Sequence, residues 1–232
     1  MRRAESLASD AEHRIPSWLR PGDPESRLPV LTALIVAICL QLAIPKSYAV
    51  VPRWPLIAME ILLLVVLVGL NPLRLKRQTT FGTWASYLLL TAITVDNTMS
   101  AIVLDIRIVS GEVSNDAAFL LGSGAAIYVT TVIVFGIWYW EMDRGGPFAR
   151  RQGSRPYPDF MFPQMTEREL APPNWRPEFP DYLYVSITNV VAFSPTDTMP
   201  LTRRAKAMMT VQAVISVTTL ALVISRAVNV LG

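Results

Sequence analysis

AAFLLGSGAAIYVTTVIVFGIWYW occupies residues 117–140 and contains no charged side chain. A hydrocarbon core of about 30 Å is crossed by about 20 helical residues, so this stretch is long enough to span a membrane. It ends in Trp138-Tyr139-Trp140, and aromatic rings of this kind gather at the membrane–water interface. The stretch therefore predicts a transmembrane helix and, with it, the fold class of the chain.

Four further apolar stretches predict four more transmembrane helices. They cover Leu28–Ile44, Trp54–Leu73, Phe81–Leu104 and Ala207–Leu231. Helices are expected because backbone polar groups that face lipid need hydrogen-bond partners within their own segment. The 232 residues are 52% hydrophobic and 17% charged, against about 25% charged in soluble domains. This composition excludes a disordered chain and an ordinary soluble enzyme, and it predicts an all-α integral membrane protein with five transmembrane helices.

Cysteine and histidine are too scarce for most catalytic or metal chemistry. Cys39 is the only cysteine, and His13, the only histidine, lies in the polar N-terminal tail. A Ser-His-Asp triad, a Cys-His dyad or a His-ligated zinc site needs a histidine near the reacting atoms. We therefore expect no enzyme activity, no cofactor and no metal site. The net charge of +3 comes from arginines beside membrane spans, so the expected partner is a lipid bilayer and not a nucleic acid.

Charge and proline divide the chain into three regions. Residues 1–27 form a soluble N-terminal tail of mixed charge, residues 28–116 a three-span membrane region, and residues 117–232 the part that holds the last two spans. Eight of the 18 prolines lie between those two spans, and proline interrupts helices. This proline-rich segment is either an irregular loop on the membrane surface or a rigid cap that packs against neighbouring subunits.

A short apolar segment precedes the last span. Tyr182–Ala192 (YLYVSITNVVA) cannot cross a bilayer at 1.5 Å per helical residue. It is followed by Phe193-Ser194-Pro195-Thr196-Asp197, where proline ends a helix. A short helix, an irregular stretch and a full span form the pattern of a re-entrant loop. Such backbone is tolerated at membrane depth only where protein buries it or where it lines a water-filled cavity.

The residues of this segment resemble the pore loop of the potassium-channel superfamily. Ser186-Ile187-Thr188, followed nine positions later by Asp197, is similar to the S-I-T run and the terminal Asp of the T-V-G-Y-G-D motif. Pro200, Thr202 and Lys206 follow at spacings found in many members. The pattern also resembles an uncharacterised family of bacterial inner-membrane proteins with a degenerate selectivity filter. The resemblance covers residues 117–232 and leaves the first three spans without a role.

The resemblance implies a channel-like pore module with a re-entrant pore-type helix between spans four and five. Its parts are an outer helix at 117–140, a proline-rich cap at 141–180, a pore helix and filter-like loop at 181–202, and an inner helix at 203–232. It further implies a homotetramer in a bacterial inner membrane that conducts a small inorganic ion by passive flow. A cation is slightly favoured by Asp197.

The same resemblance names candidate site residues. In the pore helix these are Ser186, Thr188 and Asn189, and in the filter-like loop they are Ala192, Phe193, Ser194, Pro195, Thr196 and Asp197. The loop lacks the glycines of the family's Thr-Val-Gly-Tyr-Gly, which let backbone carbonyls line up toward the ion. Potassium selectivity therefore does not carry over. The alternative is that Ser194–Asp197 form only a turn and a helix cap.

Ionisable groups inside the predicted spans allow a different function. Glu60 lies in the second span, and Asp96 lies in the third span beside Asn97. Ionisable groups are costly in a membrane and by default mark an ion or proton pathway. They favour a secondary or proton-coupled transporter, unless Asp96 is a neutral packed carboxyl and Glu60 reaches the interface. A third alternative is a non-conducting membrane scaffold with a degenerate pore loop.

We expect the N-terminus to face the cytoplasm and the C-terminus the opposite side. With five spans and a re-entrant loop, 17 of the 21 basic residues fall on the N-terminal side and 4 on the other. Basic residues mark the cytoplasmic side. Reporter fusions at the two ends measure this orientation. A C-terminal reporter that is active only in the cytoplasm would contradict it and restore the orientation of ordinary potassium channels.

Overall fold

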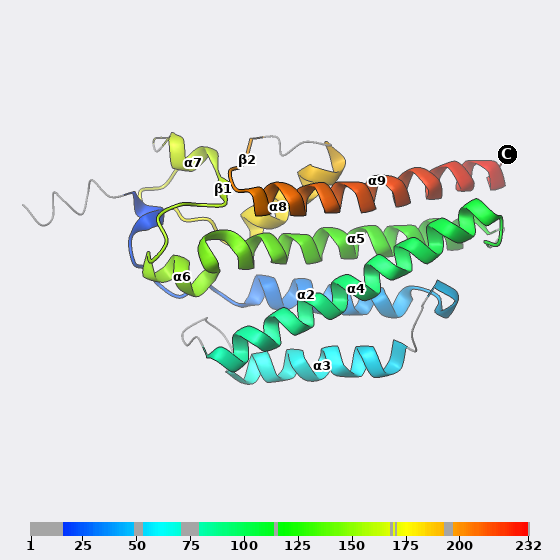
Figure 1. Ribbon diagram of the computed structural model, residues 1–232, viewed down its shortest axis with the longest axis horizontal. Coiled ribbons are helices and arrows are strands. Elements are labelled where there is room, and N and C mark those ends of the chain that lie inside the picture. Colours follow the sequence, from blue (N-terminus) through cyan, green and yellow to red (C-terminus); the bar gives the residue numbers. More distant parts are fainter. Residues whose placement is uncertain are drawn as a thin grey trace, which may run out of the picture.

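The computed structural model describes residues 16–48, 53–70, 79–113, 116–167, 169, 171–192 and 197–231. Helices account for 78% of these residues. Six long or medium helices form an elongated bundle, and most of the shorter elements gather at one end of it (Figure 1). We call this end, which holds the described residues 16–27, 143–178 and 199–200, the cap. The mostly helical architecture that the composition predicts is confirmed.

The bundle helices follow the predicted apolar stretches. They are α2 (Leu28–Ala43), α3 (Arg53–Leu70), α4 (Thr80–Ser110), α5 (Ala117–Met142), α8 (Phe179–Val191) and α9 (Arg203–Leu231). Within the described residues, three helices are long and apolar enough to cross a membrane, namely α4, α5 and α9, whereas α2 and α3 are shorter. This is compatible with an integral membrane protein.

Local sequence explains where two of the long helices begin and end. The Asp116 carboxylate accepts hydrogen bonds from the backbone N–H groups of Ala118 and Phe119 and so caps the start of α5. Thr79 caps α4 in the same way, by accepting from Gly82 N–H. Such caps satisfy the N–H groups that the first turn leaves without helical partners. At its other end α4 stops at Gly111, whose φ of 76° favours glycine.

Helix α5 is the axis of the bundle. It contacts α2, α4, α8 and α9, and every residue from 130 to 137 is buried. Figure 1 shows α9 and α8 on one side of α5 and α2 and α3 toward the other, while α4 crosses α5 and reaches α9 at the end of the bundle away from the cap. A helix that is apolar all round has to be surrounded by protein or by lipid. The uncharged stretch at 117–140 thus becomes the most enclosed helix.

The outer surface is apolar, whereas polar groups lie inside. Large apolar side chains are more than half exposed on five helices: Trp54 and Leu62 on α3, Trp84 and Ile106 on α4, Leu28 on α2, Val191 on α8, and Val214 and Val228 on α9 are examples. Gln41, Glu60, Asn97, Thr131 and Gln212 are buried. Soluble proteins rarely expose apolar patches this extensive. A surface of this kind suits lipid as the surrounding medium.

The cap is held together by aromatic rings and by the described end of the N-terminal tail. Short helices η1 (Ser17–Leu19), η3 (Asp143–Gly145), α6 (Pro147–Gln152) and α7 (Pro163–Thr166) lie here, with strands β1 (Phe160–Met161) and β2 (Met199–Pro200); η2 (Lys46–Tyr48) follows α2. Phe162 contacts the rings of Trp175 and Tyr182 edge-on. Gly22 and Arg151 exchange backbone and side-chain hydrogen bonds. The proline-rich segment therefore packs on its own chain.

We predict that Gly136→Val destabilises the bundle and that Gly122→Val does not. A Cβ at Gly136 would lie 3.1 Å from the Leu183 Cα on α8, whereas nothing lies within 4 Å of a Cβ at Gly122. Overpacking of this kind costs about 1–3 kcal/mol. The measurement is the Tm of the detergent-purified variants. Equal Tm values for the two variants would contradict the close approach of α5 and α8.

Candidate functional site

Helix α8 enters the bundle from the cap and runs alongside α5. Near its start, the Tyr182 hydroxyl donates to Asp143 Oδ2 at 2.6 Å. One turn further on, Ser186 Oγ donates to the Val132 carbonyl of α5 at 2.7 Å. Val132 lies eight residues before Trp140, or roughly 12 Å along α5. Figure 1 shows α8 ending partway along α5 and α9, well short of the far end of the bundle.

After α8 the chain returns to the cap. Strand β2 pairs with β1 in antiparallel register, with Phe160 opposite Pro200. Leu201 N–H donates to the Asp159 carbonyl at 2.8 Å, and the Thr202 hydroxyl donates to Asp159 Oδ1 at 2.6 Å. The segment between Phe179 and Arg203 thus leaves and re-enters the cap at the same end of the bundle.

A cluster around the Gln212 side chain joins α5, α8 and α9. Gln212 Nε2 donates to Ser186 Oγ at 2.6 Å and to the Ser186 carbonyl at 3.2 Å. Gln212 Oε1 accepts from the Tyr139 hydroxyl at 2.5 Å and from Asn189 Nδ2 at 2.9 Å. Asn189 also donates to the Met209 carbonyl. Tyr139, Ser186 and Gln212 are fully buried, so these hydrogen bonds replace water for every side chain in the cluster.

Two of the predicted pore-helix residues therefore hold α8 in place. Ser186 and Asn189 point into the protein's own core, toward α5 and α9. The Thr188 hydroxyl donates to the Tyr184 and Val185 carbonyls within α8, an ordinary arrangement for threonine in a helix. Ser186 and Asn189 thus support the position of α8, whereas the Thr188 hydroxyl bonds within the helix.

The predicted filter-like loop is described only at its two ends. Ala192, at the C-terminal end of α8, and Asp197 are both exposed. Phe193, Ser194, Pro195 and Thr196 lie outside the described residues. Arg203 and Arg204, which follow in the first turn of α9, are exposed as well.

The base of α8 is fixed by a buried carboxylate, Asp143. Its Oδ1 accepts from the backbone N–H of Asp159 at 2.7 Å. Its Oδ2 accepts from Tyr182 and lies 3.6 Å from Arg144 Nε. Burial raises the pKa of Tyr182 well above its usual value, so the hydroxyl keeps its proton and acts as a donor. Asp143 thereby ties α5, α8 and the strand pair to one point.

A second ion pair, between the buried Arg150 and the partly buried Glu25, fastens the N-terminal segment to the cap. The Arg150 guanidinium contacts the Glu25 carboxylate at 3.2 Å and donates to the Trp140 and Asp143 carbonyls. Trp140 Nε1 donates to the same carboxylate at 2.7 Å. Charge-assisted hydrogen bonds of this kind are about twice as strong as neutral ones. Residues 16–27 are therefore part of the cap, and the rest of the predicted tail, residues 1–15, lies outside the described residues.

The predicted intramembrane carboxyl groups come together in the first three helices. Gln41 Nε2 on α2 donates to Asp96 Oδ2 on α4 at 3.2 Å. Glu60 on α3 is fully buried and interacts electrostatically with Asp96. The Gln41 amide lies next to Glu60 as well. Yet neither Glu60 oxygen has a donor in hydrogen-bond geometry within the described part of the chain.

Asn97 belongs to a different contact, between α4 and α5. Its Nδ2 donates to Thr131 Oγ1 at 2.8 Å and to the Ile127 carbonyl at 3.2 Å. It is 3% exposed. Adjacent residues on a helix point about 100° apart, so Asp96 turns toward α2 while Asn97 turns toward α5.

Charge and family motifs in the sequence did not identify three buried or partly buried polar residues: Gln41, Asp105 and Gln212. Gln41 and Gln212 are uncharged, and Asp105 lies just beyond the predicted end of the third span. The Thr219 hydroxyl of α9 donates to Asp105 Oδ2 at 3.1 Å. A glutamine inside an apolar helix is itself a signal, because its amide needs partners wherever it is buried. That signal would have pointed to Gln41 and Gln212.

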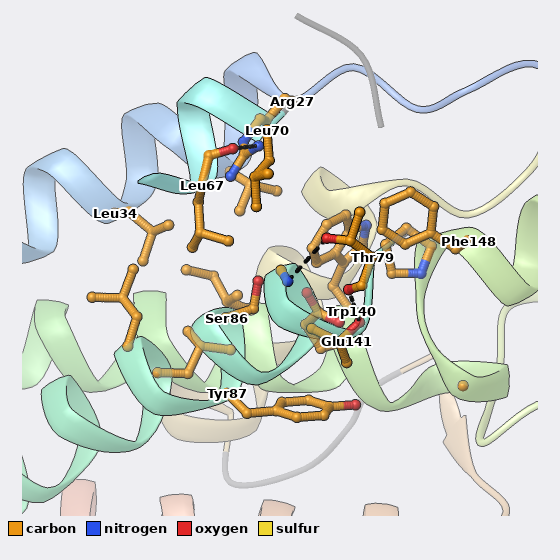
Figure 2. Close-up of a pocket in the computed structure, with 18 residues that line it drawn as sticks. Arg27, Leu34, Leu67, Leu70, Thr79, Ser86, Tyr87, Trp140, Glu141 and Phe148 are labelled. Carbon is orange, nitrogen blue, oxygen red and sulfur yellow. Dashed lines mark hydrogen bonds between the residues drawn. The ribbon is translucent and has the colours of Figure 1, made fainter. Parts of the chain in front are cut away.

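A cavity of about 70 Å³ lies between α2, α3, α4 and α5 beside the cap. Figure 2 shows Arg27, Leu67 and Leu70 on one side of it, and Thr79, Trp140 and Glu141 on another. Arg27 donates to the Leu67 carbonyl. Burial lowers the pKa of Arg27, and the nearby Glu141 carboxylate opposes this shift. The cavity is therefore apolar in its depth and charged at its cap end.

No metal site of three or more His, Cys, Asp or Glu side chains is found among the described residues. No family model, curated protein or solved structure matches this chain. The sites therefore have to be interpreted from their own geometry.

We predict that Gln212→Leu destabilises the protein strongly. The change leaves the Tyr139 hydroxyl without its acceptor and removes one hydrogen bond each from Ser186 and Asn189, and a buried polar group left without a partner costs about 1–3 kcal/mol. The measurement is the Tm of the detergent-purified protein. The matched control is Gln152→Leu, because Gln152 is an exposed glutamine at the end of α6. A Tm for Gln212→Leu that equals the control's would show that the cluster does not hold α8.

Proposed function

We propose that the protein is a channel-like pore-former with five membrane spans and one re-entrant helix, α8, and that it conducts a small ion passively. The observation that carries this proposal is the path of residues 179–203. This segment leaves the cap, runs as α8 partway along α5 and α9, and comes back to β2 in the cap. A helix that ends at membrane depth requires protein or a wet cavity around its end.

The two shorter helices complete the five spans of the proposal. Helix α2 has 16 residues and α3 has 18, so they measure about 24 Å and 27 Å. Both fall short of a 30 Å hydrocarbon core. Local thinning of the bilayer accommodates such a mismatch at a cost of fractions of a kcal/mol per Å. They lie beside the longer α4 and α5, which cover the remaining depth (Figure 1).

The pore is proposed to lie between copies of the chain, because the inside of one copy is filled. The Gln212 cluster and buried aromatic rings occupy the space between α5, α8 and α9. By contrast, α8 presents an exposed apolar face made of Tyr184, Ile187 and Val191, which are 54%, 41% and 63% exposed. Neighbouring subunits that cover this face would bring the ends of several α8 helices toward a shared axis. Four copies is the number that the pore-loop resemblance implies.

A cation is the ion that this arrangement favours. The C-terminal end of a helix carries a partial negative charge of about half an elementary charge. In the proposed assembly, the α8 ends at Ala192 would point toward the axis, and the exposed Asp197 carboxylates would ring one mouth. Rings of like charge concentrate counter-ions. The exposed Arg203 and Arg204 oppose this field, which makes weak selectivity among cations the expected behaviour.

We predict that cysteines at Ser194, Thr196 and Asp197 make cation flux sensitive to a water-soluble thiol reagent. Each is introduced singly in a Cys39→Ser background, and flux is measured in proteoliposomes before and after the reagent. Residues that line a wet axis react and block the pore. The controls are Leu121→Cys and Val129→Cys, which are exposed positions of α5. The same liposomes allow the oligomeric state to be measured by cross-linking.

Two results would contradict the proposal. The first is a purified protein that carries no cation or anion flux at all, which would favour the scaffold alternative. The second is flux that the reagent leaves unaltered at all three loop positions while the protein is a monomer or dimer. That result would favour a carrier.

A further inference from the structure

The first three helices hold a second polar site, separate from the proposed pore. Gln41, Glu60 and Asp96 come from three different helices, α2, α3 and α4, and meet in the interior. They are 0%, 0% and 7% exposed. None of them belongs to α8, α9 or the filter-like loop. Their arrangement therefore has to be explained independently of ion conduction.

The two carboxyl groups differ in their surroundings. Asp96 accepts a hydrogen bond from Gln41, and this donor stabilises an ionised carboxylate. The Gln41 amide also lies beside Glu60, but among the described residues no donor meets hydrogen-bond geometry at either Glu60 oxygen, although the side chain is fully buried. Two neighbouring carboxyl groups in an apolar interior do not both ionise, since each charge opposes the other. We propose that Glu60 and Asp96 form a binding site for one exchangeable proton, carried by Glu60 and facing an ionised Asp96.

A proton fits this site better than a metal cation does. Sodium, potassium and divalent cations require a shell of several oxygen ligands, for example six to eight for calcium. Here the Gln41 amide directs an N–H donor into the site, which opposes a cation at that position. Within the described residues, no third acidic, cysteine or histidine side chain joins the pair.

A proton would enter this site from the cavity beside the cap. It is lined by Leu34 of α2, Leu67 of α3 and Leu90 of α4. Gln41, Glu60 and Asp96 lie six or seven residues further from the cap on these same helices, which is about 10 Å. Only a buried apolar layer lies between the cavity and the pair, made of Ile38, Leu64 and Ile93. Water or a side-chain movement across this layer would connect the pair to the cap.

The other titratable groups named here on the surrounding helices either contact another residue or line the cavity. Asp105 contacts Thr219, Arg107 lies over the Tyr48 ring, Tyr139 contacts Gln212, Tyr87 stacks on Trp138, and Arg27 and Glu141 line the cavity. Glu141 and Arg27 sit at the cap side of the apolar layer. They are thus the charged groups that a proton would pass on its way to Glu60.

Infrared spectroscopy of the full-length protein in liposomes tests this site directly, because a protonated carboxyl has its own C=O stretching band. In the wild-type protein we expect such a band at neutral pH and its loss as the pH rises. Because burial also raises the pKa of Glu141, all spectra are recorded in a Glu141→Gln background, in which Glu60→Gln should abolish the band. Asp96→Asn should keep it but move its half-loss to lower pH by about one unit or more, a tenfold or larger fall in proton affinity. Asp105→Asn is the matched control on α4 and should change neither property.

Three outcomes would overturn the assignment. They are a wild-type spectrum without the band, a band that persists in Glu60→Gln, and a half-loss pH that Asp96→Asn leaves unchanged. If Glu60→Gln does not insert into membranes, the Asp96→Asn shift decides. A half-loss pH that falls when sodium or potassium is added would show that a cation competes for the site, which also contradicts a dedicated proton site. Because the readout is spectroscopic, it is independent of whether the protein conducts ions.

Discussion

One buried amide holds the C-terminal half of the protein in its arrangement. Gln212 uses its two N–H groups and its carbonyl oxygen for partners on α5 and α8. In an interior without water, a polar group left without a partner costs more than a satisfied one contributes. The cluster therefore specifies how deep α8 sits, because a shift by one turn would strand several polar groups at once. The position of the α8 end, on which the proposed pore depends, follows from this constraint.

In the cap, buried charged groups likewise need hydrogen-bond or ion-pair partners. The Asp143 carboxylate accepts hydrogen bonds from the backbone N–H groups of residues 159 and 160 and from the Tyr182 hydroxyl. Arg150 donates to the Trp140 carbonyl at the end of α5 and pairs with Glu25. Buried ions are costly unless they are paired and hydrogen-bonded. The strands and the N-terminal segment are therefore tied to the base of α8. This explains how a segment rich in proline has a defined structure without a long helix.

The two halves of the bundle leave different polar groups available for function. Around α8 the side chains of the Gln212 cluster satisfy one another, and α8 keeps an exposed apolar face and an exposed end. Around α3 and α4, in contrast, the Glu60 carboxyl lacks a donor in hydrogen-bond geometry within the described chain. The first half is thus proposed to bind a proton and the second to form the pore. The shared helix α5 packs against both, so a change in the charge of the Glu60–Asp96 pair has a physical route to α8.

The sequence by itself determined the helical class and the approximate helix positions, because long uncharged stretches and capping residues such as Asp116 act locally. It also marked Glu60 and Asp96, since charge inside an apolar stretch is visible without a fold. Only the tertiary structure decided that Asp96 meets Gln41 whereas the adjacent Asn97 meets Thr131, and that Ser186 and Asn189 face Gln212. These pairings join residues 23 to 55 positions apart. They depend on how the helices are packed and rotated against one another, which no local pattern specifies.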